Sequence, residues 1–281
     1  MDDSLRDRVA TAAAWAAAVL VGLVLTWLLF DLARRGLPAW SLELVVASPR
    51  DAGRAGGIAP ILVSTALILL TCLAAVVPVG LGTAVLLSEV LSEDRLITRV
   101  SRRSLDLLAG VPSIVFGLFG NAFFCVALGL GFSILSGGLT LAVMVLPLFA
   151  RASEEALRSV GRRDRLAAAA LGLSRTRTLW SVLLPRALPA LIAALVLSLG
   201  RAAAETAALV FTSGYVARMP SSLFDSGRAL SVHVLDLALN VPGGDARAAA
   251  SALLLLVVLL MINSGALALG SRLQRRLVAT A

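Results

Sequence analysis

The sequence predicts an all-α integral membrane protein with six transmembrane helices. Of its 281 residues, 59% are hydrophobic and only 15% are charged. The charges are also gathered into clusters, which leaves long charge-free runs between them. Soluble domains usually carry about 25% charged residues, so this composition indicates helices that face lipid.

The charge-free runs are long enough for six crossings, because a helix spans a bilayer with about 20 apolar residues. The runs lie within 9–30, over 58–88, over 107–150, from 187 onward and over 248–271. The third run has room for two crossings, and its glycine-rich stretch 128–138 is expected to form a short hairpin between them.

This pattern divides the chain into three parts. Residues 1–57 hold an N-terminal tail, the first transmembrane helix and an external loop. Residues 58–272 form a core of five transmembrane helices with a cytoplasmic loop at about 151–186. Residues 273–281 are expected to be a cytoplasmic C-terminal tail.

The distribution of arginine predicts the orientation of the chain, which has no lysine. With the N-terminus inside, 17 arginines fall on cytoplasmic segments, seven fall on external loops, and one, Arg201, lies within a span. Positive charge favours the cytoplasmic side, so both termini are expected in the cytoplasm. The same bias accounts for the net charge of +8 without a nucleic-acid partner. The first span is too long for a signal-peptide core and is expected to remain uncleaved.

Several chemistries are unlikely on composition alone. A phosphate-binding P-loop needs a lysine, so no nucleotide site is expected in this chain. The single histidine, His233, is expected in an exposed external loop, and no carboxylate cluster has metal-ligand spacing. Cys72 and Cys125 fall within predicted spans and are expected to be small buried residues. The sequence therefore predicts no enzyme, no metal site and no cofactor.

The stretch RAAAETAAL, residues 201–209, places two charges in an apolar span. Arg201 and Glu205 are four residues apart, so on a continuous helix they share a face and can pair. One interpretation is a structural pair that holds helices together. The other is a face that lines a passage, where Arg201 attracts an anion and Glu205 holds the arginine in place. Thr206 either adds a hydroxyl to that face or bonds back to its own helix.

The cytoplasmic loop 151–186 reads as a series of helices. Ser153 is expected to cap a helix over SEEALRSV, and Gly172 is expected to end an alanine-rich helix over 165–171. Ser174 is expected to cap the helix that follows. Two interpretations remain: an amphipathic linker on the anionic inner leaflet, or a docking element that offers a small apolar face to a cytoplasmic partner.

Residues 165–189 resemble the EAA loop of ABC-importer permeases, which in that family forms the coupling helix in a groove of the ATPase subunit. The positions that match the family pattern are Ala167, Ala168, Gly172 and Ser174, followed by Leu184, Pro185 and Pro189. Two positions depart from the family pattern: its glutamate falls on Leu166, and its glycine after the second proline is Ala190. The lost glutamate implies a more apolar contact with the ATPase. On this resemblance, the ATPase-coupling residues are Arg165, Leu166, Ala167, Ala168, Gly172, Leu173 and Ser174.

Three further stretches are similar to phosphate-specific permeases: LAGVPSIVFGLFG (108–120), GRAAAETAALVFTSG (200–214) and the segment 226–255. The last of these is similar to the PstA-type subunit in particular. The resemblance covers roughly residues 60–270 and implies the type I ABC importer permease fold. It also implies that Arg201, Glu205 and Thr206 line the substrate pathway.

The resemblance further implies phosphate import by alternating access in a bacterial inner membrane. The expected partners are a homologous PstC-type permease, two copies of a cytoplasmic ATPase that binds ATP and Mg, and a periplasmic phosphate-binding protein. One alternative is a permease for another oxyanion, such as molybdate or sulfate. A second is an ATP-independent channel or secondary transporter, which would need its own coupling-ion site, whereas Glu205 is the one acidic group predicted inside a span.

Overall fold

The computed structural model describes residues 3–92 and 94–279. Apart from one short hairpin, its regular structure is helical. The principal elements are α1 (Asp3–Gly36), α2 (Leu42–Val46), β1 (Pro49–Arg50), β2 (Ala55–Gly56), α3 (Ala59–Val85), α4 (Leu96–Ala109), α5 (Ser113–Gly120), α6 (Ile134–Arg158), α7 (Arg162–Ala170), α8 (Arg175–Thr178), α9 (Leu184–Ala203), α10 (Ala207–Val210), α11 (Leu230–Leu239) and α12 (Asp245–Ala279). Short 3₁₀ turns cover Leu37–Ala39 and Asp51–Gly53, and π-helical turns cover Leu86–Val90, Asn121–Ala127 and Leu179–Leu183.

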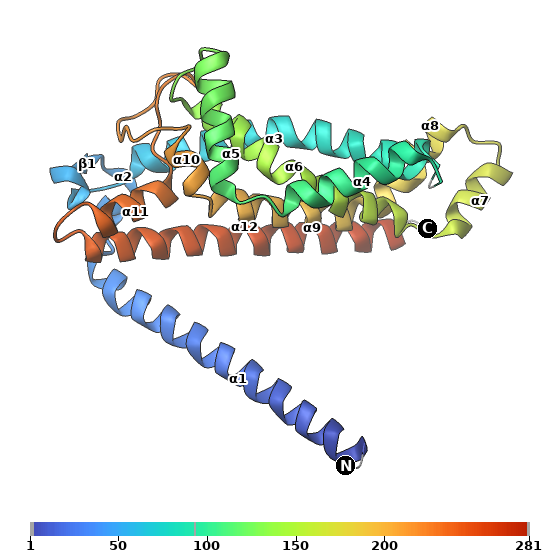
Figure 1. Cartoon of the computed structure of the whole chain (residues 1–281), viewed down its shortest axis with the longest axis horizontal. Helices are drawn as coiled ribbons and strands as arrows, with labels where there is room; N and C mark the ends of the chain where they lie inside the picture. Colours follow the sequence, from blue (N-terminus) through green and yellow to red (C-terminus); the bar gives the residue numbers. More distant parts are fainter. Residues whose placement is uncertain (1–2, 93, 280–281) are drawn as a thin grey trace.

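Four long helices, α3, α6, α9 and α12, form a bundle along the long axis of the molecule (Figure 1). In the described part of the chain, five helices are long and apolar enough to cross a membrane, or six if one bent pair is counted as a single span. This confirms the predicted fold class of a helical, multi-pass membrane protein.

The bent pair is α4 and α5, which meet at 99°. The predicted crossing at the start of the 107–150 run is therefore not one straight helix, because it is broken at residues 110–112. The bend occurs over Gly110, Val111 and Pro112, where proline lacks an N–H and disfavours a helical conformation at the residue before it. As a result α4 runs along the bundle and α5 turns away from it (Figure 1).

The glycine-rich stretch 128–138 is a loop only as far as Ser133. The side chain of Ser133 caps α6 by accepting a hydrogen bond from the N–H of Ser136 at 3.1 Å. Gly137 and Gly138 therefore lie inside α6, and the prediction of a hairpin over the whole stretch is wrong. A Cβ on Gly138 would lie 2.5 Å from the Cβ of Thr71, so glycine here permits close packing of α6 on α3.

The core of the bundle lies between α3 and α6 and extends to α5, α9, α10 and α11. Cys72 and Cys125 are buried free thiols, as predicted. By contrast, none of the apolar window of α1 is buried, and α1 diverges from the bundle in Figure 1. Its last residue, Gly36, packs closely on Ala249 and Leu253 of α12.

The two ends of the bundle carry different segments. The N-terminal end of α1, the C-terminal end of α12, and α7 and α8 all lie toward one end of the long axis (Figure 1). The hairpin β1–β2 lies at the other end with α2 and α11, and its pairs are Pro49 with Gly56 and Arg50 with Ala55. This separation agrees with the predicted placement of loop 151–186 on the same side as both termini. Helix α12 continues to Ala279, whereas residues 280 and 281 of the predicted tail lie outside the described residues.

Candidate functional site

Arg201 and Glu205 are separated by a break in the fifth predicted span, with Arg201 in the last turn of α9 and Glu205 inside the break. Helix α9 ends at Ala203, residues 204–206 are not helical, and α10 begins at Ala207. Among the described residues, no hydrogen bond or ion pair joins Arg201 to Glu205. The predicted pairing at i and i+4 is therefore wrong, because it requires one continuous helix.

Glu205 instead stabilises the start of α10. Its Oε1 accepts hydrogen bonds from the N–H groups of Thr206 at 3.2 Å and Ala208 at 3.3 Å, so the carboxylate caps amides that have no helical acceptor. The carbonyl oxygen of Glu205 accepts a hydrogen bond from Ser231 Oγ of α11 at 2.6 Å. These contacts hold the break in place from both sides.

Thr206 lies at the break, at the position immediately before α10. Its hydroxyl makes no hydrogen bond to the described part of the chain. The alternative of a threonine bonded back to its own helix is therefore wrong, and the half-buried hydroxyl remains available to another group.

Arg201 lies in an open groove of about 520 Å³ between α6, α9 and α12. The groove is otherwise lined mainly by apolar side chains, among them Leu148, Leu197 and Leu267, and none of its lining residues is acidic. The guanidinium is exposed and makes no ion pair with any described residue. An arginine at the centre of a transmembrane helix costs about 2.5–3.5 kcal/mol on insertion scales. The groove thus presents a cation with no counter-ion of its own.

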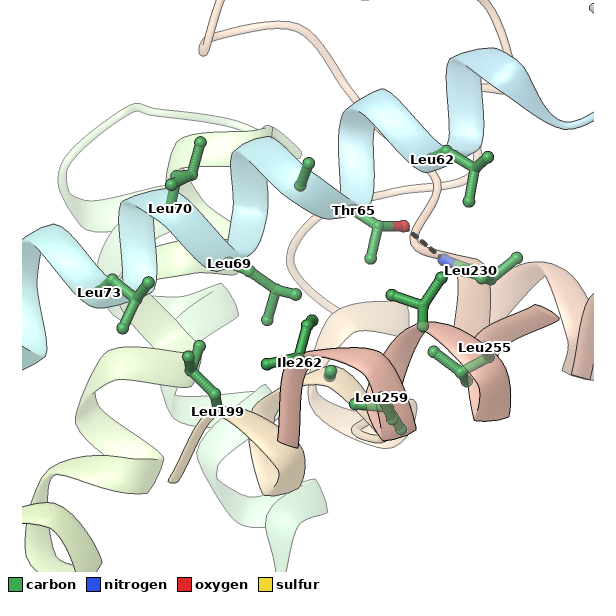
Figure 2. A pocket seen from close by; sticks show the side chains of 13 residues that line it. Leu62, Thr65, Leu69, Leu70, Leu73, Leu199, Leu230, Leu255, Leu259 and Ile262 are labelled. Carbon is green, nitrogen blue, oxygen red and sulfur yellow. Dashed lines mark hydrogen bonds between the residues drawn. The ribbon is translucent and has the colours of Figure 1, made fainter. Parts of the chain in front are cut away.

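A second pocket, of about 390 Å³, lies between α3, α9, α11 and α12 (Figure 2). Thr65 is its most polar side chain, and Thr65 Oγ1 accepts a hydrogen bond from the N–H of Leu230 at 2.8 Å. Leucines such as Leu69, Leu199 and Leu259 form most of the remaining wall. No charged side chain lines this pocket, so of the two it is the groove at Arg201 that can bind an anion.

The segment after α6 forms the predicted helix–glycine–helix arrangement. Gly172 has φ of +69°, a conformation that glycine adopts at little cost. The N–H groups of Gly172 and Leu173 donate hydrogen bonds to the carbonyl oxygens of Ala169 and Ala168, respectively, and these bonds end α7. Ser174 caps α8 by accepting a hydrogen bond from the N–H of Arg177. The predicted roles of Gly172 and Ser174 in ending and starting these helices are confirmed.

The predicted cap at Ser153 is wrong, because α6 continues without interruption to Arg158. Ser153 is buried inside α6. The sequence signal misled because serine followed by two glutamates is typical of a helix start, yet here the same residues lie where α6 packs against α4.

The residues predicted to couple to an ATPase divide into an exposed set and an anchored set. Leu166 is 58% exposed and Leu171 is 79% exposed, so together they present apolar surface to the outside. Ala168 is buried. The exposed predicted residues are Leu166, Ala167, Gly172 and Ser174, with Leu173 half-buried.

Arg165 is anchored within the chain. Its guanidinium forms an ion pair with Glu89, at the end of the span that begins with α3, and donates a hydrogen bond to the carbonyl oxygen of Leu157 at 2.9 Å. Asp164 forms a second ion pair, with Arg186 of α9. Helix α7 is thus tied by charge to the ends of α3, α6 and α9.

Glu154 is a polar residue of this region that the sequence interpretation missed. It is 1% exposed, and its carboxylate contacts three arginines: Arg102 of α4 at 2.8 Å, and Arg151 at 2.8 Å and Arg158 at 3.1 Å on its own helix. The spacing of Arg151, Glu154 and Arg158 fits one helix face. That spacing could have identified the cluster, had the helix been predicted to continue.

His233 is also placed differently from the prediction of an exposed loop residue. It lies in α11 and is 1% exposed. Burial and, to a smaller extent, the nearby guanidinium of Arg228 together lower the pKa of His233 to about 4, whereas Asp236 opposes the shift. His233 Nδ1 lies 3.4 Å from Arg228 Nη1. The neutral imidazole is therefore the form that the folded protein favours.

The groups of ionisable side chains in this structure are not suited to a metal. Within residues 3–92 and 94–279, no three side chains of histidine, cysteine, aspartate or glutamate are grouped as metal ligands are. The polar clusters described above combine carboxylates with arginines instead.

The model of a known family, the binding-protein-dependent transport system inner membrane component, matches residues 76–278. The chain belongs to this family. It is accordingly a multi-pass membrane subunit, the permease component of an ABC transporter. Family membership also implies, in general terms, an ATPase and a binding protein as partners.

Three relatives match over most of the chain. The probable ABC transporter permease protein YqgI of Bacillus subtilis is 29% identical over 294 residues, covering 99% of this chain and 100% of that protein. The phosphate transport system permease protein PstA 2 of Mycobacterium bovis is 32% identical, covering 75% of this chain and 70% of that protein. PstA of Pasteurella multocida is 32% identical and covers 70% of both chains.

Among solved structures, the inward-facing MetNI methionine ABC transporter is similar, with a TM-score of 0.59 over 77% of this chain and 94% of the matched chain. The sequence identity is 18%, so this likeness concerns the fold alone. It confirms the predicted type I permease fold.

Proposed function

We propose that this chain is the transmembrane permease subunit of an ATP-driven phosphate importer, of the PstA type. The observation that carries the proposal is Arg201, which makes no ion pair with any described residue and lies in a mainly apolar groove beside a helix break. Guanidinium offers a planar set of donors suited to phosphate. The PstA names of similar proteins support the same substrate.

The passage forms between this chain and a homologous PstC-type permease, and Arg201 attracts the anion into it. Polar or charged groups within membrane spans commonly mark substrate paths, and broken helices commonly form such sites. Glu205 maintains the break by capping α10, and Thr206 offers a hydroxyl at the same level. A single arginine in an open groove binds weakly enough to release what it admits.

ATP hydrolysis is performed by two copies of a cytoplasmic ATPase, which bind ATP and Mg. They contact the exposed face that includes Leu166, Ala167 and Gly172. Movement of α7 reaches α3 through the Arg165–Glu89 pair and reaches α9 through the Asp164–Arg186 pair. Since α9 carries Arg201, this route connects the ATPase to the groove and alternates access between the two sides.

The complex lies in a bacterial inner membrane with both termini of this chain in the cytoplasm. The loops 34–57 and 212–247 then face outward, where a phosphate-binding protein delivers the anion. The arginine bias of the sequence and the placement of α7 and α8 at the same end as the termini support this orientation.

The test is anion uptake by proteoliposomes that contain this chain, its partner permease, the ATPase and the binding protein. We expect uptake of labelled phosphate, with a loss of about tenfold or more in Arg201→Ala and a smaller loss in Arg201→Lys, which keeps the charge but not the planar fork. Uptake of sulfate or molybdate in place of phosphate would show that the substrate is wrong. Wild-type phosphate uptake by Arg201→Ala would remove the role of Arg201.

A further inference from the structure

Asn263 is the second polar side chain of the groove at Arg201. It belongs to α12, within the apolar run LLMINSGA, and lines the groove together with residues of α6 and α9. It is half-buried. An amide inside a membrane is costly unless its donors and acceptor are bonded. In the described part of the chain, the side chain of Asn263 makes no hydrogen bond.

Arg201 and Asn263 offer different hydrogen-bonding groups to the same space. The guanidinium of an arginine only donates, whereas an asparagine amide both donates and accepts. No carboxylate and no other amide line the groove. The side-chain carbonyl of Asn263 is therefore the one side-chain acceptor among the lining residues.

The side-chain carbonyl of Asn263 can distinguish tetrahedral oxyanions, because these anions differ in whether they carry a hydroxyl group at neutral pH. Near neutral pH, inorganic phosphate and arsenate keep at least one hydroxyl, which needs an acceptor, whereas sulfate keeps none. A site that provides an acceptor for a substrate hydroxyl discriminates against the analogue that lacks it, because the acceptor is then left unpaired.

The geometry points to Asn263 as a specificity-determining residue: its Oδ1 accepts a hydrogen bond from the hydroxyl of a protonated oxyanion whose charge is held by Arg201. This inference rests on the proposed function and adds to it. It places selection for phosphate over fully deprotonated oxyanions within the membrane-spanning subunit.

The experiment measures anion binding to the purified complex of both permeases and the ATPase, without the binding protein. Thermal stabilisation at increasing concentrations of inorganic phosphate, arsenate and sulfate at neutral pH gives an apparent Kd for each anion. We expect wild type to bind phosphate and arsenate more tightly than sulfate. Asn263→Leu should reduce that preference by about three- to tenfold, as expected for one hydrogen bond.

Two further variants keep the test decisive. Met261→Leu, on an exposed part of α12 away from the groove, should keep the wild-type preference. Asn263→Thr, which retains a group that donates and accepts, should keep most of it, and it serves if Asn263→Leu fails to fold.

The outcomes separate this inference from the proposed function. If Arg201→Ala weakens binding of every anion while Asn263→Leu leaves the phosphate-to-sulfate ratio unchanged, the pathway stands and the role of Asn263 is wrong. If Arg201→Ala changes nothing either, the groove is not an anion site and both fail.

Discussion

Arg201 and Glu205 have different roles because three residues between α9 and α10 leave the helical conformation. The carboxylate of Glu205 accepts hydrogen bonds from the backbone N–H groups of Thr206 and Ala208, so it does not act as a counter-ion for Arg201. The positive charge of Arg201 then remains in the groove for an incoming anion. In the proposed pathway a paired carboxylate would compete with that anion, and the break prevents this pairing within the helix.

The buried imidazole of His233 predicts a dependence of stability on pH. Its pKa in the folded protein is about 4, below the ordinary value of about 6.5. Between these values the unfolded chain binds more protons at this residue, so stability is complete above pH 6.5 and decreases as the pH falls toward 4. The expected loss between pH 6.5 and pH 5 is on the order of 2 kcal/mol.

Melting temperatures of the detergent-solubilised protein at pH 7 and pH 5 measure this effect. His233→Gln, which has no titrating ring, should show a clearly smaller decrease between the two pH values. An equal decrease in wild type and variant would mean that groups other than His233 account for the acid sensitivity.

At the scale of elements, Glu154 holds α4 against α6. Replacing it by glutamine leaves three arginines without their shared carboxylate, and breaking a buried ion pair in this way typically costs about 3–5 kcal/mol. Since the three arginines are partly exposed, we expect Glu154→Gln to cost about 2–3 kcal/mol in the free energy of unfolding. Glu155 is the matched control, because it is adjacent but exposed, and Glu155→Gln should be nearly neutral. Denaturant unfolding of the purified protein compares them, and equal effects would contradict the role given to Glu154.

The end of α7 depends on the conformation of Gly172. Alanine at φ of +69° is strained by about 1 kcal/mol, although a Cβ there would meet no neighbouring atom. Gly161, at the start of α7, has φ of −59° and equally open surroundings. We therefore expect Gly172→Ala to lower ATPase stimulation in the assembled complex several-fold, and Gly161→Ala to leave it close to wild type. The reverse order would show that the αL conformation is not what couples the loop.

Local sequence signals predicted some elements well. Gly172 and Ser174 end and start helices through short-range backbone hydrogen bonds, which depend on the nearest few residues. The membrane-spanning helices could be predicted because the long apolar runs are visible in the composition of each segment alone. The break after Ala203 and the unbroken course of α6 through Ser153 depend instead on packing between distant segments. The alanine-rich flanks of Glu205 favour a helix locally, and the contact of its carbonyl with Ser231 could not be anticipated from spacing. Asn263 was missed because no motif connects it with Arg201.

At the scale of the whole molecule, the proposed topology places α7, α8 and both termini at the cytoplasmic end and the β1–β2 hairpin at the external end. Single cysteines test this separation, because the native Cys72 and Cys125 are buried and should react slowly. Met219→Cys in the loop 212–247 and Thr176→Cys in α8 both lie at exposed positions. In right-side-out vesicles, a membrane-impermeant thiol reagent should label Met219→Cys and spare Thr176→Cys until the membrane is permeabilised. Labelling in the opposite order would invert the proposed topology.

The surface of α1 and the groove at Arg201 are both left exposed by the rest of this chain. Both leave surface uncovered that lipid or a second permease must cover. The polar clusters of this chain include the helix break, the α4–α6 junction and the surroundings of α7. In the proposed mechanism, the contacts around α7 transmit the movement of the ATPase to the groove.

The most direct test of the account is ATP hydrolysis by the reconstituted complex with phosphate-loaded binding protein on the outer side, measured together with phosphate uptake. We predict that phosphate stimulates hydrolysis in wild type, that Gly172→Pro abolishes the stimulation because proline cannot adopt φ of +69°, and that Arg201→Ala abolishes uptake. If phosphate stimulates neither hydrolysis nor uptake in wild type, or if Arg201→Ala transports phosphate at the wild-type rate, the central claim is contradicted.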